Sequence, residues 1–335
     1  MKDSILPLGK LPFSFLEELL SMIPRKKDKR ILIRPGIGRD VAVIEMGDKF
    51  LALKTDPITL TGELQGWYLV NVNANDVVTS GAEPRWFLVT ALFPKGYAKK
   101  KVKELMRGVV EACEELGILL VGGHSEVTEV VSQPTLIGFM VGEGKRESLL
   151  TPERVRAGDD IILTKGIAIE GTSIIASEKE GALKELLGER EIERAKKFLF
   201  NPGISVVKEA EILSREGAVY LHDPTEGGIK AGVYEMGYAI KKGVEIEERN
   251  IHIYPETEEI CHIFGIDPYR LLASGALLAV IPTERTSSIL EKLRKSGITA
   301  QRIGKIVEKG YWWIKRDGRR VFLTPSSQDE LLKIF

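Results

Sequence analysis

The chain has 335 residues, which exceeds the roughly 250–300 residues over which a single hydrophobic core usually grows, so two domains are expected. Hydrophobic residues make up 43% and charged residues 29%, a composition that excludes a disordered chain. The 48 basic residues balance the 48 acidic ones, so no net charge favours nucleic acid or an anionic membrane, and a small polar substrate is expected.

The predicted elements of the first half alternate between helices and strands. The clearest helix lies at 99–116, where apolar residues such as Leu105, Val109 and Cys113 repeat at three- and four-residue steps. The other elements predicted here are a helix at 14–22, paired strands at 41–44 and 50–53, a helix at 67–80, a buried strand at 118–121 and a strand at 135–141. Turn-prone residues then place the end of the first domain near residue 155.

The second half again mixes both kinds of element. Its predicted elements are strands at 160–164, 218–222, 277–281, 299–306 and 311–314 and helices at 191–200, 205–215, 228–242 and 287–295. In the helix at 228–242, Ile229, Val233, Met236 and Ile240 share one face, which we interpret as core. The pattern predicts a two-domain α+β protein, with domains at 1–155 and 156–335.

The two cysteines, Cys113 and Cys261, lack the spacing of a zinc site or a disulfide framework. Cys113 occupies an apolar position of its helix, so a buried core residue is expected, with a reactive thiol as the alternative. No stretch has the apolar character of a signal peptide or the ~18 apolar residues of a membrane helix. A soluble, cytoplasmic protein is expected.

Four short motifs in the first domain carry acidic residues or glycines. They are GIGRD at 36–40, KTDP at 54–57, NANDVVTSGAEP at 73–84 and GGHSEVT at 122–128. Asp40, Asp56 and Asp76 come from separate segments, as do the oxygen ligands of Mg²⁺ ions that bridge a polyphosphate. Asp40 as a turn residue and Asp56 as a strand-end cap are the structural alternatives. Asp76 is harder to explain structurally, because it lies among asparagines in a helical pattern that they do not favour.

A further motif, His222-Asp223-Pro224-Thr225-Glu226-Gly227-Gly228, follows a predicted strand and opens a helix. Backbone amides at a helix N-terminus are free to meet an anion, and the helix dipole assists. The alternative is that Asp223 or Thr225 only caps the helix.

The order and spacing of these motifs resemble the PurM-like superfamily, which includes aminoimidazole ribonucleotide (AIR) synthase, selenophosphate synthetase, thiamine-monophosphate kinase and the hydrogenase maturation factor HypE. The resemblance is strongest to HypE. It implies a two-domain fold in which N-terminal sheets of two copies form a shared barrel in a homodimer, while the C-terminal domain is an α/β sandwich. It also implies ATP and Mg²⁺ as cofactors.

On this resemblance, the metal ligands are Asp40, Asp56, Asp76 and Glu126. The residues that contact the nucleotide are Lys10, Gly36, Gly38, Thr55, Asn73, Gly122, Gly123, Ser125, Thr225, Gly227 and Gly228. His124 and Asp223 are the catalytic candidates. A hydrogen-bonded structural role for His124 and an exposed position in a mobile tail for Lys10 are the alternatives.

HypE proteins end in a cysteine that accepts a carbamoyl group, whereas this sequence ends in Leu331-Leu332-Lys333-Ile334-Phe335. We therefore expect an ATP-dependent enzyme that activates an amide or carbonyl oxygen of a small-molecule or protein-borne acceptor, giving ADP and phosphate, without that self-modification. A small-molecule kinase of the thiamine-monophosphate type and a non-catalytic nucleotide-binding assembly partner are the alternatives. Neither nucleic acid nor a membrane is expected as a partner.

Overall fold

The computed structural model describes residues 5–24, 26, 28–58, 64–325 and 328–335. Tertiary contacts divide the chain into two compact units. The N-terminal unit consists of Asp28–Arg34 and Asp40–Leu149, and the C-terminal unit consists of Leu150–Phe335, Pro35–Arg39 and the described part of Met1–Lys27. The division after residue 149 lies near the predicted one, but two early segments belong to the C-terminal unit.

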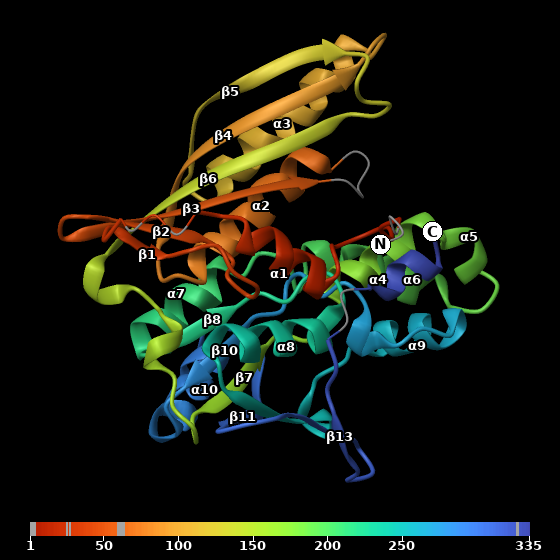
Figure 1. Cartoon of the computed structure of the whole chain (residues 1–335). Coiled ribbons are helices and arrows are strands. Elements are labelled where there is room, and N and C mark those ends of the chain that lie inside the picture. The colour runs from red at the N-terminus through yellow and green to blue at the C-terminus, as the bar shows by residue number, and fades with distance from the viewer. Residues whose placement is uncertain (1–4, 25, 27, 59–63, 326–327) are drawn as a thin grey trace. The chain divides into compact units, whose positions relative to one another are not determined.

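The N-terminal unit is built on one six-stranded sheet in the order β1-β2-β3-β6-β4-β5 (Figure 1). Its elements are β1 (Ile31–Ile33), β2 (Ala42–Met46), β3 (Lys49–Ile58), α2 (Gln65–Val78), β4 (Glu83–Pro94), α3 (Lys99–Glu115), β5 (Leu119–Thr128) and β6 (Thr135–Lys145). All neighbouring strands are antiparallel except β4 and β5, which are parallel. The parallel pair requires a crossover, and α3 supplies it.

The two helices of this unit differ in how they are buried. α3 follows the predicted amphipathic pattern and buries Leu105, Val109, Ala112 and Cys113 on one face. Burial also raises the pKa of the Cys113 thiol to about 11, so this cysteine is a core residue as expected. α2 is buried almost all round, and its buried residues include three asparagines and Asp76.

Strand β5 differs from its prediction. The segment at 118–121 was expected to be buried, but Leu119, Leu120 and Val121 are 62%, 37% and 54% exposed. The reason is the position of β5 at the edge of the sheet, where among the described strands it pairs only with β4. Strand β4 itself, which has twelve residues and lies between β6 and the edge strand β5, was not predicted.

The C-terminal unit contains a seven-stranded mixed sheet in the order β13-β12-β9-β11-β7-β10-β8. Its strands are β7 (Asp160–Thr164), β8 (Tyr220–His222), β9 (Gly243–Glu247), β10 (Leu278–Ile281), β11 (Ala300–Val307), β12 (Tyr311–Ile314) and β13 (Arg320–Phe322). Its α-helices are α1 (Phe13–Ser21), α4 (Ile169–Glu178), α5 (Glu180–Leu183), α6 (Glu189–Lys196), α7 (Val207–Glu216), α8 (Gly228–Ile240), α9 (Pro255–Phe264) and α10 (Thr286–Lys295).

Clusters of buried hydrophobic residues hold this unit together. Ile229, Val233, Met236 and Ile240 of α8 join the core of the sheet, as their spacing predicted. A second core lies among α4, α6 and α9 and contains Cys261. The early segments attach to α8 and β8, where the ring of Phe13 meets Tyr234 edge-on at 5.4 Å and the Tyr220 hydroxyl donates to the Gly38 carbonyl at 2.8 Å.

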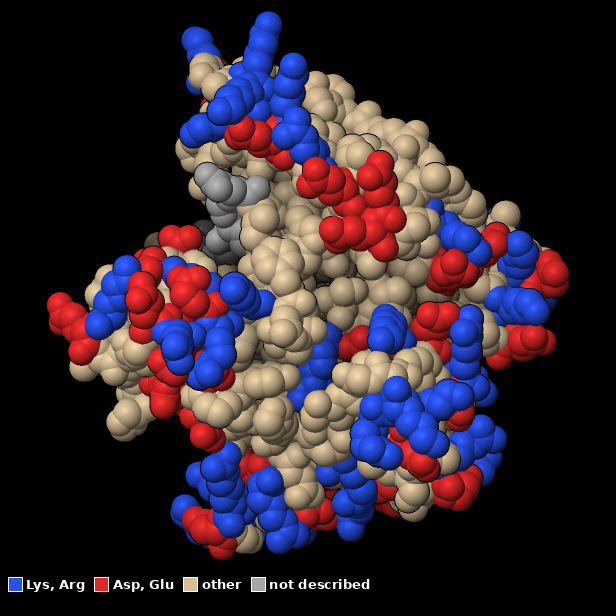
Figure 2. All heavy atoms as spheres, turned by 180° about the vertical axis from the view of Figure 1, so that it is seen from behind, with Lys and Arg blue, Asp and Glu red and all other residues tan. Residues whose placement is uncertain are grey.

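Charges of both signs are distributed over the surface. On the face shown in Figure 2, lysine and arginine side chains lie among aspartate and glutamate side chains. Charge of a single sign therefore does not cover this face, in keeping with the balanced composition. Among the described residues, no helix combines the length and the apolar character needed to cross a membrane.

Candidate functional site

In the N-terminal unit, two of the predicted metal ligands meet around a lysine. The Lys54 ammonium lies 3.4 Å from an oxygen of Asp56 and 3.2 Å from an oxygen of Asp76. Lys54 and Asp56 are two residues apart on β3 and so point to the same face of the sheet, while Asp76 comes from α2. Two carboxylates this close repel each other unless a cation lies between them, and here the ammonium provides that charge.

Asn73 completes this group from one turn earlier on α2. Its amide nitrogen donates to the Leu69 carbonyl at 2.8 Å and to the Asp56 carbonyl at 3.4 Å. Its Oδ1 atom is fully buried and accepts no hydrogen bond within the described part of the chain. Asn73 thus adds a buried amide oxygen one turn before Asp76 on the same helix, and oxygen atoms are the ligands that Mg²⁺ prefers.

The third predicted metal ligand, Asp40, is half-buried in the segment that leads into β2. It comes two residues before Ala42 of β2, which pairs with Leu53 of β3. Thr55 of β3, a predicted nucleotide contact, already donates its hydroxyl to the Gly138 carbonyl of β6 at 2.8 Å.

The Gly122-Gly123-His124-Ser125-Glu126 motif forms part of the exposed edge strand β5. The Nε2 atom of His124 lies 3.2 Å from an oxygen of Glu126, on the same face of the strand. Gly123 has a structural reason to be glycine, because a Cβ atom there would lie 2.0 Å from the Val89 carbonyl oxygen of β4. The motif thus presents an exposed imidazole–carboxylate pair.

In the C-terminal unit, Lys10 reaches two residues of the region around the His222–Gly228 motif. Its ammonium donates to the Thr225 hydroxyl at 3.0 Å and lies 3.8 Å from Glu235, which in turn lies 3.2 Å from the Nε2 atom of His222. Burial favours a neutral carboxyl, but the charges of Lys10 and His222 outweigh it and hold the pKa of Glu235 below its usual value.

His222 and Glu235 were not among the predicted site residues. A signal for both was present in the sequence, since His222 directly precedes Asp223 and Glu235 lies two turns beyond Gly228 on the same helix face. Asp223 follows β8 and is buried.

The two predicted anion-binding amides of this motif already have acceptors. Gly227 donates to a carboxylate oxygen of Asp329 at 2.7 Å, and Gly228 donates to the Thr225 carbonyl at 3.1 Å. The expectation that these amides are free is therefore wrong for this structure. The carboxylate of Asp329, near the end of the chain, takes the place that a bound anion would have at the Gly227 amide. Burial raises the pKa of Asp329 to about 6, although its carboxylate accepts three backbone hydrogen bonds that oppose this change.

The predicted glycines at 36 and 38 differ in environment. Gly38 has a φ of +68°, and a Cβ atom there would lie 2.3 Å from the backbone oxygen of Glu235. The backbone at Gly38 therefore packs closely against the backbone of α8, which a side chain at this position would prevent. At Gly36 the nearest atoms to an added Cβ would belong to the flexible side chain of Arg39, at 3.2 Å and beyond.

Comparison with known families gives two matches along the chain. Residues 38–143 match the AIR synthase related protein, N-terminal domain, and residues 156–312 match the AIR synthase related protein, C-terminal domain. Among individual relatives, the chain is 28% identical to a selenide, water dikinase of Methanocaldococcus jannaschii, covering 90% of each chain. It is 24% identical to the carbamoyl dehydratase HypE of Escherichia coli, covering 82% of each.

Solved structures share the fold. The chain superimposes on HypE from a HypE–HypF complex with a TM-score of 0.74 at 19% identity, covering 93% of this chain and 99% of the other. AaThiL complexed with AMPPCP and TMP gives 0.75 at 20% identity, covering 98% and 100%. The hydrogenase maturation protein HypE in complex with ATP gives 0.68 at 19% identity, covering 93% and 91%.

Proposed function

Because the chain belongs to the AIR synthase related, PurM-like family, we propose that it is a cytoplasmic, Mg²⁺-dependent enzyme of the HypE type that uses ATP. The reaction is transfer of the γ-phosphoryl group to an amide or carbonyl oxygen of an acceptor. The bond from the γ-phosphorus to ADP breaks, a bond to the acceptor oxygen forms, and phosphate leaves when the activated acceptor reacts. The HypE structure that contains ATP supports the choice of nucleotide.

The meeting of Asp56 and Asp76 is the observation that carries this proposal. These two carboxylates, together with Asp40 and Glu126, would hold Mg²⁺, and Asn73, one turn before Asp76 on α2, offers a further buried oxygen. Bound Mg²⁺ would supply the charge that allows a triphosphate to approach carboxylates. Lys54 keeps the two carboxylates together until then.

The other residues of the proposed site fall into two groups. Those that would contact the nucleotide are Lys10, Gly36, Gly38, Thr55, Asn73, Gly122, Gly123, Ser125 and Thr225, with Gly227 and Gly228 taking part only if Asp329 and Thr225 release their amides. His124 and Asp223 would handle the acceptor and its proton. Phosphoryl transfer needs mainly positioning and charge stabilisation, which such polar groups provide.

Calorimetry with Mg²⁺ and ATP tests the metal site. We expect Asp76→Asn, which keeps the side-chain volume, to abolish Mg²⁺-dependent ATP binding while circular dichroism stays unchanged. Asp48→Asn is the matched control, since Asp48 is an exposed aspartate in the turn between β2 and β3 of the same unit. Wild-type ATP affinity in Asp76→Asn would remove Asp76 from the metal site.

Two alternative functions are separated by turnover. A small-molecule kinase is supported by the similarity to AaThiL, which was solved with TMP, and would release a phosphorylated product and ADP in equal amounts. A HypE-type enzyme would release ADP and phosphate together. A non-catalytic assembly partner would bind ATP without releasing either, and the HypE–HypF complex is an example of protein association in this fold.

The acceptor is expected to come from another molecule. Cys113 and Cys261 are both buried, and burial raises the pKa of their thiols to about 11 and about 12. Neither therefore offers a thiolate to a carbamoyl group. A small-molecule or protein-borne amide remains the proposed substrate.

A homodimer joined through β5 is part of the proposal. β5 is an edge strand with Leu119, Val121 and Val127 more than half exposed, at 62%, 54% and 63%. Unpaired backbone groups beside exposed apolar side chains favour association with another strand. A second copy of β5 would pair with the free backbone groups of this strand and would cover its exposed apolar side chains.

A further inference from the structure

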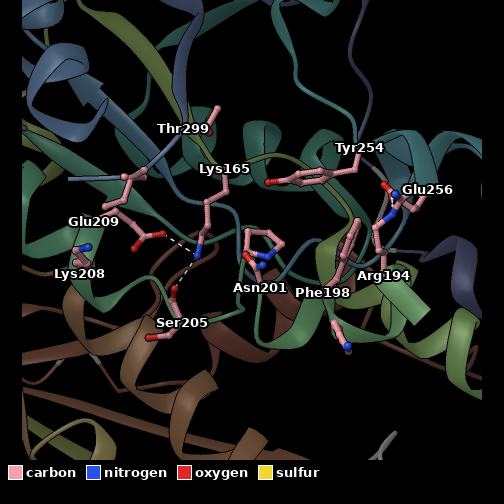
Figure 3. Close-up of a pocket in the computed structure, with 14 residues that line it drawn as sticks. Lys165, Arg194, Phe198, Asn201, Ser205, Lys208, Glu209, Tyr254, Glu256 and Thr299 are labelled. Atoms are coloured by element: carbon pink, nitrogen blue, oxygen red, sulfur yellow. Dashed lines mark hydrogen bonds and ion pairs between the residues drawn. The ribbon is translucent and has the colours of Figure 1, made fainter. Parts of the chain in front are cut away.

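The C-terminal unit contains a cavity of about 630 Å³ that the proposed reaction does not use (Figure 3). Its walls come from the segment after β7, from the end of α6 through to the start of α7, from the start of α9 and from the segment before β11. This volume lies within the roughly 300–1,000 Å³ typical of small-molecule sites.

One wall is held in place by the buried side chain of Lys165. Its ammonium lies 2.8 Å from Glu209 and donates to the carbonyl oxygens of Gly203 and Ser205 at 2.9 and 2.7 Å. Figure 3 shows the contacts of Lys165 with Glu209 and Ser205. The backbone of Lys165 has a φ of +57°, an unusual conformation for a residue with a side chain. Such backbone strain is concentrated at functional sites.

The cavity has an excess of positive charge. Its two carboxylates are both neutralised, Glu209 by Lys165 at 2.8 Å and Glu256 by Arg194 at 2.7 Å. Lys197 and Lys208 also line the cavity, and neither forms an ion pair with any described carboxylate. Lys208 uses one of its three donors on the Ser296 carbonyl at 2.9 Å, so two donors remain.

Two aromatic side chains also line the cavity. The rings of Phe198 and Tyr254 pack edge to face with centroids 4.9 Å apart. The Tyr254 ring packs closely against the backbone of Gly166, where an added Cβ atom would lie 2.8 Å from the ring. Burial raises the pKa of Tyr254 to about 12, so its hydroxyl remains a neutral hydrogen-bond donor.

We propose that this cavity binds a small phosphorylated metabolite with a planar ring, its phosphate attracted by the excess positive charge that Lys197 and Lys208 bring to the lining and its ring against Tyr254. Two lysine ammonium groups with no carboxylate partner match a doubly charged phosphate. A rigid aromatic wall matches a planar group. The site does not depend on the proposed ATP reaction, because none of its residues belongs to that machinery.

Phenyl phosphate is the minimal probe, because it carries both features, and inorganic phosphate carries only the charge. We expect calorimetry on the full chain to show that phenyl phosphate binds more tightly than inorganic phosphate. In the double variant Lys197→Gln, Lys208→Gln its dissociation constant rises at least about tenfold. The matched control is Lys309→Gln, Lys315→Gln, two exposed lysines of the same unit outside this cavity, which changes it less than about twofold.

Two further variants make the result specific. Tyr254→Leu should reduce the affinity for phenyl phosphate to that for inorganic phosphate, with circular dichroism confirming the fold. Asp76→Asn should leave phenyl phosphate binding unchanged, which separates this site from the proposed nucleotide site. The proposal is overturned if phenyl phosphate shows no binding at millimolar concentration, if it binds no better than inorganic phosphate, or if the double lysine variant binds it like the wild type.

Discussion

Glu170, near the start of α4, makes the stability of the C-terminal unit depend on pH. The residue is 7% exposed. Burial raises its pKa from 4.5 to about 7, a hydrogen bond with Ser274 opposes that change, and the nearby charges of Asp329 and Glu226 add to it. The substitution Glu170→Gln keeps the size and the hydrogen-bonding capacity of this side chain but removes its charge.

The sign of the effect follows from proton binding. Because the folded-state pKa is higher than the unfolded-state value, the folded protein binds more protons between pH 4.5 and about 7. The contribution of Glu170 to stability is therefore most favourable at low pH and is lost as the pH rises through 7. At 1.36 kcal/mol per pH unit, the interval between 4.5 and about 7 corresponds to a loss of about 3 kcal/mol.

Urea unfolding followed by circular dichroism at pH 5 and pH 8 measures this effect. From pH 5 to pH 8 the unfolding free energy of the wild type should fall by about 2–3 kcal/mol more than that of Glu170→Gln. The reason is that most of the range between the unfolded-state pKa of 4.5 and the folded-state pKa of about 7 lies between these two pH values. Glu178→Gln, an exposed change on the same helix, should show no such difference from the wild type. If the difference in unfolding free energy between Glu170→Gln and wild type is the same at both pH values, the buried carboxyl does not titrate as the structure indicates.

Two other predictions concern the N-terminal unit. Lys54→Met removes the ammonium that occupies the meeting point of Asp56 and Asp76, so the affinity for Mg²⁺ in the absence of nucleotide should rise about tenfold by calorimetry. An affinity equal to or weaker than that of the wild type would show that Lys54 does not compete with the metal. Val121→Asp places a charge on the exposed edge strand β5, so light scattering should report a dimer for the wild type and mainly monomer for the variant. Equal masses for the two proteins would refute pairing through β5.

Local patterns identified many of the elements. The helices α3 and α8 were predictable because their buried residues repeat at helical spacing, and the structure buries those same residues. The motifs also identified the family, because short stretches around Asp40, Asp56 and Asp76 keep their order along the chain whatever the fold does elsewhere. The matches at 38–143 and 156–312 confirm that identification.

Strand position could not be predicted from these patterns. A run such as 118–121 is apolar both in a central strand and in an edge strand, so burial depends on whether a neighbour pairs on each side. β4 was missed although it lies between β6 and β5. The register of strands distant in sequence decides these points, and no local window contains it.

The sequence by itself determined the family, the amphipathic helices and the candidate acidic residues, because each depends on residue type and short-range spacing. Only the tertiary structure decided that the Lys54 ammonium contacts both Asp56 and Asp76. It also decided that the Gly227 amide donates its hydrogen bond to Asp329, which is 102 residues away in the sequence. Charge and hydrogen-bond partners act over a few ångströms in space, and chain folding brings together groups that spacing along the sequence cannot relate.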